Sequence, residues 1–474
     1  MLWQPSLPDI YLKLAPDQLA AAIATRRREL GDSLFILGHH YQTDDVIRHA
    51  DATGDSLKLS QIAADIAKSR PVKYVIFCGV HFMAESADML TPEHVRVILP
   101  DLSAGCSMAD MAQYDDTVEA WDSIHAALNA RPGGFQGRVI PITYVNSSAA
   151  IKAFVGAHGG ACCTSSNAHR VFKWALGSSA LRAESALGGP ALRAGSAATP
   201  PSDPTLASDD IRILFLPDQH LGRNTACKFG LDPTRDMALY DPRLARAGDD
   251  LGGSTPEQIQ RSKVILWAGH CSVHKLFRPE HCDQIRAQDA ANPGRPPTTI
   301  LVHPECAKEV VDKADMQGST EFIIKTLRAA PPGSRWAVGT EVHLVNRQAR
   351  EAAARPDGAV HVRILSDCQC LCTTMYRIDE PHMLWVLDNL AGVEAQADSE
   401  RGGRPQPPHD QLGVPASTTP VSTATLTPRF ADLDRLPGKP RVVNQIQVHA
   451  DVRKDALLAL DRMLDQAETL AMVD

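Results

Sequence analysis

Short apolar stretches alternate with amphipathic stretches from about residue 33 to residue 391. The apolar stretches are so nearly uninterrupted that they suit strands covered on both faces of a sheet. Strands that alternate with helices in this way are typical of a parallel α/β fold. The predicted strands are SLFILG (33–38), VKYVIFCG (72–79), VRVILP (95–100), VIPITYV (139–145), IRILFLP (211–217), VILWAG (264–269), TILVH (299–303), WAVG (336–339) and VHVRIL (360–365).

Helical periodicity is clearest in two stretches. In residues 54–69, apolar side chains recur at helical spacing, and Asp55 or Ser56 can cap the start of the helix. Residues 451–473 carry a second such pattern, which predicts a closing helix docked on the body of the protein. Residues 177–210 and 394–428 are rich in Ala, Gly, Ser, Thr and Pro instead, and each is predicted to be a flexible insertion.

A weak threefold repeat becomes visible once the first insertion is left out. Each repeat opens with a strand that ends in polar residues and closes with a strand that is followed by cysteine. Ligands in α/β folds bind at the carboxyl ends of strands, so three such units facing one another would share one site. We therefore expect domains at 1–113, 114–280 and 281–393, with residues 429–474 docking on the body.

Composition restricts the class of protein. The chain of 474 residues is 22% charged with a formal net charge of −8, and it lacks the basic patch that nucleic-acid binding requires. We find neither a signal peptide pattern nor an apolar run of membrane-spanning length. These features predict a cytoplasmic protein with no nucleic-acid or membrane partner. Its 11 cysteines then favour metal ligands or core residues over disulfides.

Three cysteine positions follow the strands that close the repeats. They are Cys106, Cys271 and one of Cys368, Cys370 and Cys372. Thiolates bind soft metals and iron–sulfur clusters. Zinc would favour paired C-x-x-C spacings, and none occurs. Ligands from three separate segments leave one metal position open for a substrate.

Ionisable side chains stand at the ends of two opening strands, in GHHY (38–41) and HPEC (303–306). Side chains alternate across a strand, so His39 and Tyr41 should share a face that His40 does not. Together with His303 and Glu305 they form a set that can transfer protons. Hydroxyls and amides that either cap helices or bind anions are Ser56, Asn146, Ser147, Ser165, Ser166 and Thr320.

Ordered motifs along residues 33–391 carry a resemblance to the quinolinate synthase family. They are H-x-Y-Q at 39–42, GDSL at 54–57, G-V-x-F-M-A-E-S at 79–86, GCSMA at 105–109, YVNSSA at 144–149, TSSNA at 164–168, GHCSVH at 269–274, and HPEC and KADxxGST within 303–320. The resemblance implies three pseudo-symmetric, three-layer α/β/α domains with short parallel sheets and a [4Fe–4S] cluster at their common interface.

The same resemblance implies an activity in NAD biosynthesis. Iminoaspartate and dihydroxyacetone phosphate condense to quinolinate, releasing phosphate and water, with the open iron of the cluster as Lewis acid. L-aspartate oxidase or aspartate dehydrogenase is the implied functional partner. The resemblance implies Cys106, Cys271 and Cys372 as ligands of the cluster. It implies that substrate carboxylate or phosphate groups bind to His39, Ser56, Ser165, His303 and Thr320, and that Tyr144 and Asn146 line the pocket. Tyr41 and Glu305 are the implied acid–base residues, with His39 as a third catalytic residue and Glu305 also in contact with substrate.

Geometry alone does not separate the cysteines of CQCLC (368–372), which alternate along one strand face. Cys372 is favoured because C-x-x-M (372–375) matches the last ligand of the family, and because a helical pattern at 373–391 follows it. Two other classes of protein compete with the synthase. An iron–sulfur electron carrier or redox sensor normally uses four protein ligands, and a zinc hydrolase is not expected to use thiolates alone.

Overall fold

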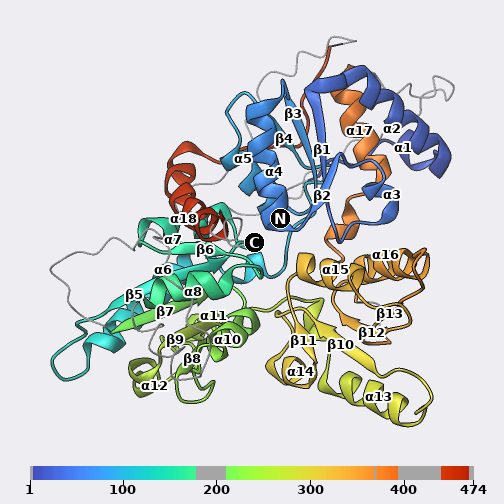
Figure 1. Cartoon of the computed structure of the whole chain (residues 1–474). Helices are drawn as coiled ribbons and strands as arrows, with labels where there is room; N and C mark the ends of the chain where they lie inside the picture. The colour runs from blue at the N-terminus through green and yellow to red at the C-terminus, as the bar shows by residue number, and fades with distance from the viewer. Residues whose placement is uncertain (1–3, 178–209, 368–369, 393–438, 469–474) are drawn as a thin grey trace, which may run out of the picture.

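The computed structural model describes residues 4–177, 210–367, 370–392 and 439–468. Nearly all of the two predicted insertions lies outside these residues. The described chain forms three sheets with helices packed around them (Figure 1). It is an α/β protein, as predicted.

The three sheets repeat one strand order. The first sheet has the order β14-β4-β3-β1-β2, the second β6-β5-β7-β9-β8, and the third β11-β10-β12-β13. When the strands are counted in chain order within each unit, the first strand lies between the second and the third, and the third lies beside the closing strand. All pairings but that of β14 with β4 are parallel. The strands are β1 (Leu34–His39), β2 (Ala52–Gly54), β3 (Tyr74–Cys78), β4 (Arg96–Ile98), β5 (Arg138–Tyr144), β6 (Ala161–Cys163), β7 (Ile211–Leu216), β8 (Met237–Tyr240), β9 (Val264–Trp267), β10 (Thr298–Val302), β11 (Met316–Gln317), β12 (Arg335–Gly339), β13 (His361–Ile364) and β14 (Gln445–Ile446).

The predicted strands are confirmed, and the strands that the sequence did not reveal are short edge strands. β2, β6, β11 and β14 have two or three residues each, too few for an apolar run to stand out. β8 is longer but carries the exposed Leu239 at the sheet edge. The central strands are almost wholly buried, since helices cover both sheet faces.

The helices begin mostly at the positions that local sequence favours. Asp55 caps α4 by accepting a hydrogen bond from the Lys58 backbone N–H at 2.9 Å, as predicted. The helices are α1 (Asp9–Leu12), α2 (Pro16–Leu30), α3 (Asp44–Ile47), α4 (Ser56–Ser69), α5 (His81–Leu90), α6 (Tyr114–Asn129), α7 (Ala149–Ala157), α8 (Ala168–Leu176), α10 (Gln219–Cys227), α11 (Pro242–Arg246), α12 (Pro256–Arg261), α13 (Pro279–Ala290), α14 (Lys308–Lys313), α15 (Thr320–Arg328), α16 (Val342–Ala353), α17 (Glu380–Ala391) and α18 (Ala450–Glu468). No helix in the described ranges is long and apolar enough to cross a membrane.

Two helices pack outside the unit to which sequence order assigns them. α17 follows the third sheet but packs against α2 of the first unit (Figure 1). α18 packs chiefly on α7 and β6 of the second unit, while β14 just before it extends the first sheet. The three predicted domain ranges each contain one parallel sheet, but their boundaries remain a prediction because packing crosses them.

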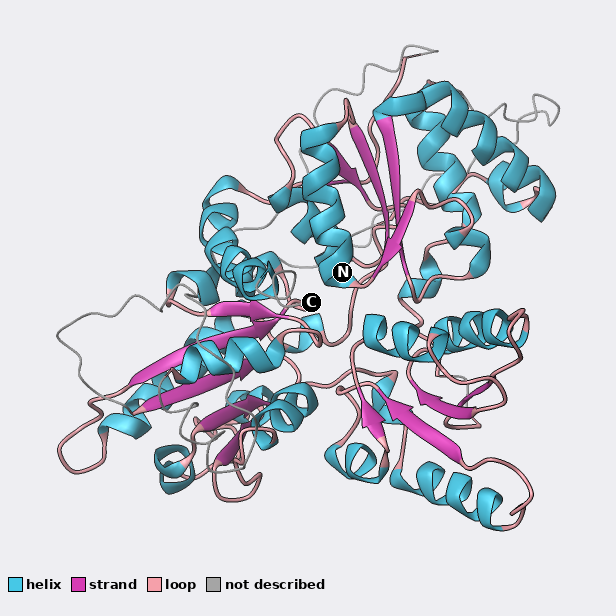
Figure 2. Cartoon of the chain, viewed as in Figure 1, coloured by secondary structure: helices cyan, strands magenta, loops and turns pink. Residues whose placement is uncertain are grey.

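The carboxyl ends of the parallel strands in the three sheets converge on a common centre (Figure 2). The arrowheads of β1 and β3, of β5 and β7, and of β10 and β12 all point inward. This convergence brings together the loops that follow the strands.

Asp388 on α17 anchors this helix to the first unit. It accepts hydrogen bonds from the Tyr11 hydroxyl at 3.0 Å and from Arg26 Nε at 2.7 Å, and it is largely buried. We predict that Asp388→Asn destabilises the protein by about 1–3 kcal/mol, because a buried charge-assisted hydrogen bond is lost. The thermal unfolding midpoint should fall. The matched variant Asp9→Asn, in an exposed ion pair with Lys13, should leave it unchanged. Equal midpoints for both variants would contradict this prediction.

Candidate active site

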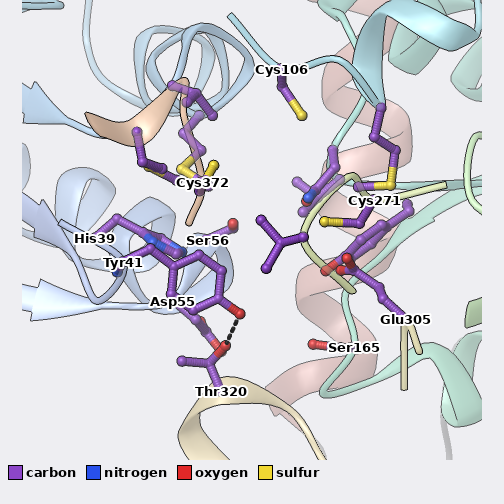
Figure 3. A pocket seen from close by; sticks show the side chains of 18 of the residues that line it. His39, Tyr41, Asp55, Ser56, Cys106, Ser165, Cys271, Glu305, Thr320 and Cys372 are labelled. Carbon is purple, nitrogen blue, oxygen red and sulfur yellow. Dashed lines mark hydrogen bonds between the residues drawn. The ribbon is translucent and has the colours of Figure 1, made fainter. Parts of the chain in front are cut away.

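A cavity lies where the three sheets converge. Every residue that the family resemblance implied for the site lines this cavity. Ser147 and Ser166, which the sequence also offered as capping or anion-binding residues, do not line it. The Ser147 hydroxyl instead donates to the Tyr144 carbonyl at 2.9 Å, and the Ser166 hydroxyl lies 3.4 Å from Asp55. Cys106, Cys271 and Cys372 border one end, and Ser165 and Thr320 lie toward the other (Figure 3). The side chains come from all three units, so the site is complete only when the units are packed together.

The first strand of each unit supplies a pair of side chains at equivalent positions. The last residue of the first strand that pairs with the third strand is Gly38 in the first unit, Thr143 in the second and Val302 in the third. The next residues are His39, Tyr144 and His303, and two positions further stand Tyr41, Asn146 and Glu305. All six line the cavity. His40 points away and bonds Glu321 at 2.9 Å, which confirms the predicted alternation.

The second strand of each unit supplies a hydroxyl. Gly54 pairs with His39 and Cys163 with Tyr144, and Gly318 holds the equivalent place after β11. Two residues beyond these positions come Ser56, Ser165 and Thr320. Ser56 and Thr320 are the first residues of their helices, whereas Ser165 lies in the turn before α8. Asp55 and Ser319 cap these two helices, so the hydroxyls of Ser56 and Thr320 do not serve as caps.

The closing strand of each unit leads to a cysteine. Short 3₁₀ turns begin three residues after each one, at Ala109–Met111, His274–Leu276 and Met375–Arg377. The carbonyl of each cysteine accepts the backbone N–H four residues on, at 3.0 Å for Cys106, 3.1 Å for Cys271 and 3.0 Å for Cys372. The helical pattern predicted for 373–391 was wrong in extent, since a turn and then α17 occupy this stretch.

The structure places Cys370 differently from Cys372. Cys370 is fully buried in the third unit, where its sulfur lies 3.1 Å from the Ser366 hydroxyl. Cys372 lines the cavity and lies 3.5 Å from the Thr374 hydroxyl. Cys368 lies outside the described residues.

Two histidines are held as neutral donors. His39 Nδ1 accepts the backbone N–H of Tyr41 at 3.1 Å, and His303 Nδ1 accepts that of Glu305 at 3.3 Å. Burial lowers the pKa of each imidazole to about 3. Because Nδ1 is an acceptor, the remaining proton sits on Nε2, and in His303 this atom lies 3.2 Å from the Ser165 hydroxyl.

Tyr41 and Glu305 have opposite proton affinities. Burial, together with the nearby Glu305, raises the pKa of the Tyr41 phenol well above its usual value, so it stays protonated. Burial alone would also favour a neutral Glu305. Its interactions with His274, His303 and Tyr144 together outweigh burial and lower the pKa of this carboxyl. His274 Nδ1 lies 2.9 Å from Glu305 Oε2. The cavity thus holds a phenol that can donate a proton and a carboxylate that can accept one.

Comparison with known proteins identifies the family. Residues 21–182 and 205–403 match the family described as Quinolinate synthetase A protein. The quinolinate synthase of Nocardioides sp. is 50% identical over 363 residues, which cover 76% of this chain and 79% of that protein. The quinolinate synthase of Anoxybacillus flavithermus is 41% identical over 465 residues, 98% of this chain and 97% of that protein.

This chain belongs to the quinolinate synthase family. It is therefore an enzyme with quinolinate synthase activity in NAD biosynthesis, and the motif resemblance is confirmed. Membership of this family excludes the alternative that the protein is an electron carrier or redox sensor. It also decides against a zinc hydrolase, although Cys271, His274 and Glu305 offer ligand atoms within 4.8 Å of one another.

The quinolinate synthase family uses a [4Fe–4S] cluster, and the donor set in the cavity fits such a group. Burial raises the pKa of Cys106 to about 12 and also raises the pKa values of Cys271 and Cys372. Neighbouring thiols raise the pKa values of Cys106 and Cys271 further. Three neighbouring thiolates in a buried site are stable only beside a compensating cation, as cluster iron provides.

Sequence analysis missed several polar side chains of the site. Asp55, Thr164, His274 and Thr374 line the cavity, and Thr340 contacts Tyr41. His274 stands three residues after Cys271, within the quoted GHCSVH motif, so its signal was present. Thr340 follows an ordinary apolar strand, and no local pattern distinguishes it.

The depressed pKa of His303 predicts a pH-dependent contribution to stability. Between pH 6.5 and about 3, the unfolded chain binds a proton at this imidazole that the folded protein does not. Stability should therefore fall as pH falls below 6.5. His303→Gln should make the fall shallower, by up to about 1.4 kcal/mol per pH unit. Thermal unfolding of the two cluster-loaded proteins from pH 7 to pH 5 measures this difference, and parallel curves would contradict it.

Proposed function

We propose that iminoaspartate and dihydroxyacetone phosphate condense to quinolinate in this cavity, with release of phosphate and water. The observation that carries the proposal is the division of the cavity. Three thiols border one end, Ser165 and Thr320 lie toward the other, and a phenol and a carboxylate of opposite proton affinity lie in the same cavity. Both substrates are anionic, and the reaction needs proton transfers and an electrophile.

In this proposal Cys106, Cys271 and Cys372 hold the [4Fe–4S] cluster. The common turn after each of them supports the choice of Cys372 over Cys370, because Cys372 holds the same place before its turn as Cys106 and Cys271 hold before theirs. Burial raises the pKa of Cys372, and the Thr374 hydroxyl and the backbone N–H groups of Met375 and Thr374 counteract part of this rise. With three protein ligands, the bound cluster supplies a Lewis acid through its fourth iron.

Substrate carboxylate and phosphate groups bind, in our proposal, to Ser56, Ser165, Thr320, His39 and His303. Ser56 and Thr320 open α4 and α15, whose first N–H groups and dipoles favour negative charge. The Nε2–H groups of the neutral histidines donate hydrogen bonds without adding charge. This arrangement lets an acidic protein bind anions locally.

Tyr144 and Asn146 line the pocket beside the reacting groups. The Tyr144 phenol interacts with both Glu305 and Ser165. Asn146 Oδ1 is buried and has no hydrogen-bond partner among the described residues. A buried amide oxygen left without a donor costs stability unless a ligand satisfies it. We assign it to a substrate hydroxyl or N–H group.

The acid–base roles follow from the two pKa directions. Glu305, as carboxylate, takes a proton from the substrate carbon next to the carbonyl, and Tyr41, as phenol, gives a proton to a departing or carbonyl oxygen. His39, in edge contact with Tyr41 at 4.7 Å between ring centroids, orients this phenol. L-aspartate oxidase or aspartate dehydrogenase would supply iminoaspartate, and the cytoplasmic location stays a prediction.

Replacement of the proposed acid and base tests these roles. Tyr41→Phe and Glu305→Gln should each lower turnover roughly 10²–10⁴-fold, the range for a positioned proton-transfer group, while the cluster is kept. Quinolinate formation and visible absorbance are measured together under anaerobic conditions. Near-normal turnover in both variants would exclude these side chains as the proton-transfer groups.

Serine substitutions test the ligand assignment. The protein isolated without air should hold about four iron and four sulfide per chain. Cys372→Ser should lose both iron and activity. Cys370→Ser, changed two residues away in the same loop, should keep both and serves as the matched control. The assignment is wrong if Cys370→Ser empties the site and Cys372→Ser does not.

A further inference from the structure

The side chain of Asn224 joins the second unit to the loop that carries Glu305 in the third. Asn224 lies on α10 and is buried, and α10 packs against α14 of the third unit. Its amide Nδ2 donates hydrogen bonds to the carbonyls of Pro304 and Cys306, both at 2.9 Å. These two residues stand on either side of Glu305 in the chain. One side chain of the second unit therefore brackets the proposed base.

The peptide group between Pro304 and Glu305 is held at both of its polar atoms. Its carbonyl accepts the hydrogen bond from Asn224, and its N–H donates to His303 Nδ1 at 3.3 Å. Because a peptide group is planar, these two bonds restrict the direction in which the Glu305 side chain leaves the backbone. In that direction the carboxylate lies 2.9 Å from His274 Nδ1.

The Asn224 amide would be a poor choice if the residue served packing alone. Both of its N–H donors are used, but Oδ1 is buried and has no hydrogen-bond partner in the described part of the chain. A buried acceptor without a donor costs stability. A leucine of similar shape would fill the same space without this cost. What the amide adds is the pair of hydrogen bonds to the Glu305 loop.

The third unit carries a donor at the equivalent position. Leu216 and Gly339 are the last residues of β7 and β12 that pair with the first strand of their units. Asn224 stands eight residues after Leu216, and Arg347 stands eight residues after Gly339. Asn224 on α10 and Arg347 on α16 therefore occupy the same place in the repeated fold.

Arg347 makes the same contact with the first unit that Asn224 makes with the third. It donates hydrogen bonds to the carbonyls of His40 at 2.9 Å and Gln42 at 2.6 Å, the residues on either side of Tyr41. The proposed acid and the proposed base are thus bracketed in the same way, each from a neighbouring unit.

The first unit does not repeat this contact. Its equivalent residue is Ser86, whose hydroxyl donates to the Phe82 carbonyl at 2.8 Å within its own helix. In the loop that carries Asn146, the Ser147 carbonyl accepts a hydrogen bond from Lys152 of the same unit. Bracketing from a neighbouring unit therefore coincides with the two loops that carry the proposed acid and base.

We propose that Asn224 is a positioning residue for the reaction, whose amide holds the Glu305 loop in the geometry that proton abstraction requires. The inference rests on the proposed role of Glu305 as the base. It makes the second unit responsible for the alignment of a base that the third unit carries.

Asn224→Leu removes both donors and nearly keeps the shape of the side chain. We expect kcat to fall roughly 10–100-fold with KM changed by less than about threefold, since a misplaced base slows turnover more than it weakens binding. The matched variant is Gln260→Met on α12 of the same unit. Gln260 also donates an amide N–H to a backbone carbonyl, that of Ala127 at 2.9 Å, but it does not line the cavity. Its turnover should be unchanged.

Double variants test whether Asn224 acts through Glu305. Asn224→Leu added to Glu305→Gln should lower kcat little further, because the base that it positions is already gone. Added to Ser56→Ala, which leaves the base in place, the same substitution should have its full effect. A general structural role would multiply the losses on both backgrounds, and this result would overturn the proposal.

Absorbance of the cluster and the unfolding midpoint accompany each assay. Asn224→Ala serves as a second variant, because it removes the donors without placing an apolar group against the carbonyls. If Asn224→Leu and Asn224→Ala both lose the cluster, the amide is structural and the proposal is overturned.

The outcomes separate this inference from the function on which it rests. If Glu305→Gln keeps its turnover, the base role fails, and Asn224 has no base to position. If Glu305→Gln is slow while Asn224→Leu turns over normally, the inference alone fails. A loss in Asn224→Leu that lies wholly in KM also overturns it, because the amide then affects binding and not the alignment of the base.

Discussion

The convergence of strand ends from three parallel sheets is the constraint on which the site depends. A parallel strand delivers the residues after it to the same edge as its neighbours, so each unit presents a first-strand pair, a hydroxyl and a cysteine on one side. One unit alone supplies only a third of the set. The interfaces between units therefore determine the geometry of the site, and contacts such as Asp388 with Arg26 and Arg347 with the His40 carbonyl hold the units together.

Burial decides the charge state of almost every group in the cavity. It raises the pKa of Tyr41 and lowers that of His39 and His303, so these side chains stay neutral. Glu305 is an exception because His274 contacts it directly. In the proposed function, an anionic substrate thus meets neutral hydrogen-bond donors and helix starts, while Glu305 keeps its charge as the proposed base.

The sequence predicted the central strands and the cavity-lining residues because these depend on local patterns and on recognisable motifs. It could not place α17 on the first unit, since packing between distant segments leaves no local pattern. It also left the choice among the cysteines of CQCLC open on geometry alone. One signal was overlooked: Cys106, Cys271 and Cys372 are each followed by Ser or Thr, whereas Cys370 is followed by Leu. The common turn after the three cysteines gives this pattern its meaning.

The three units have nearly equivalent backbones, but the side chains at equivalent positions differ in their chemistry. Position for position, His39, Tyr144 and His303 correspond, and so do Tyr41, Asn146 and Glu305. The repeat of similar groups suits the cysteines, which we propose bind one cluster together. A condensation with proton transfers requires the opposite at the other positions, namely one acid, one amide and one base.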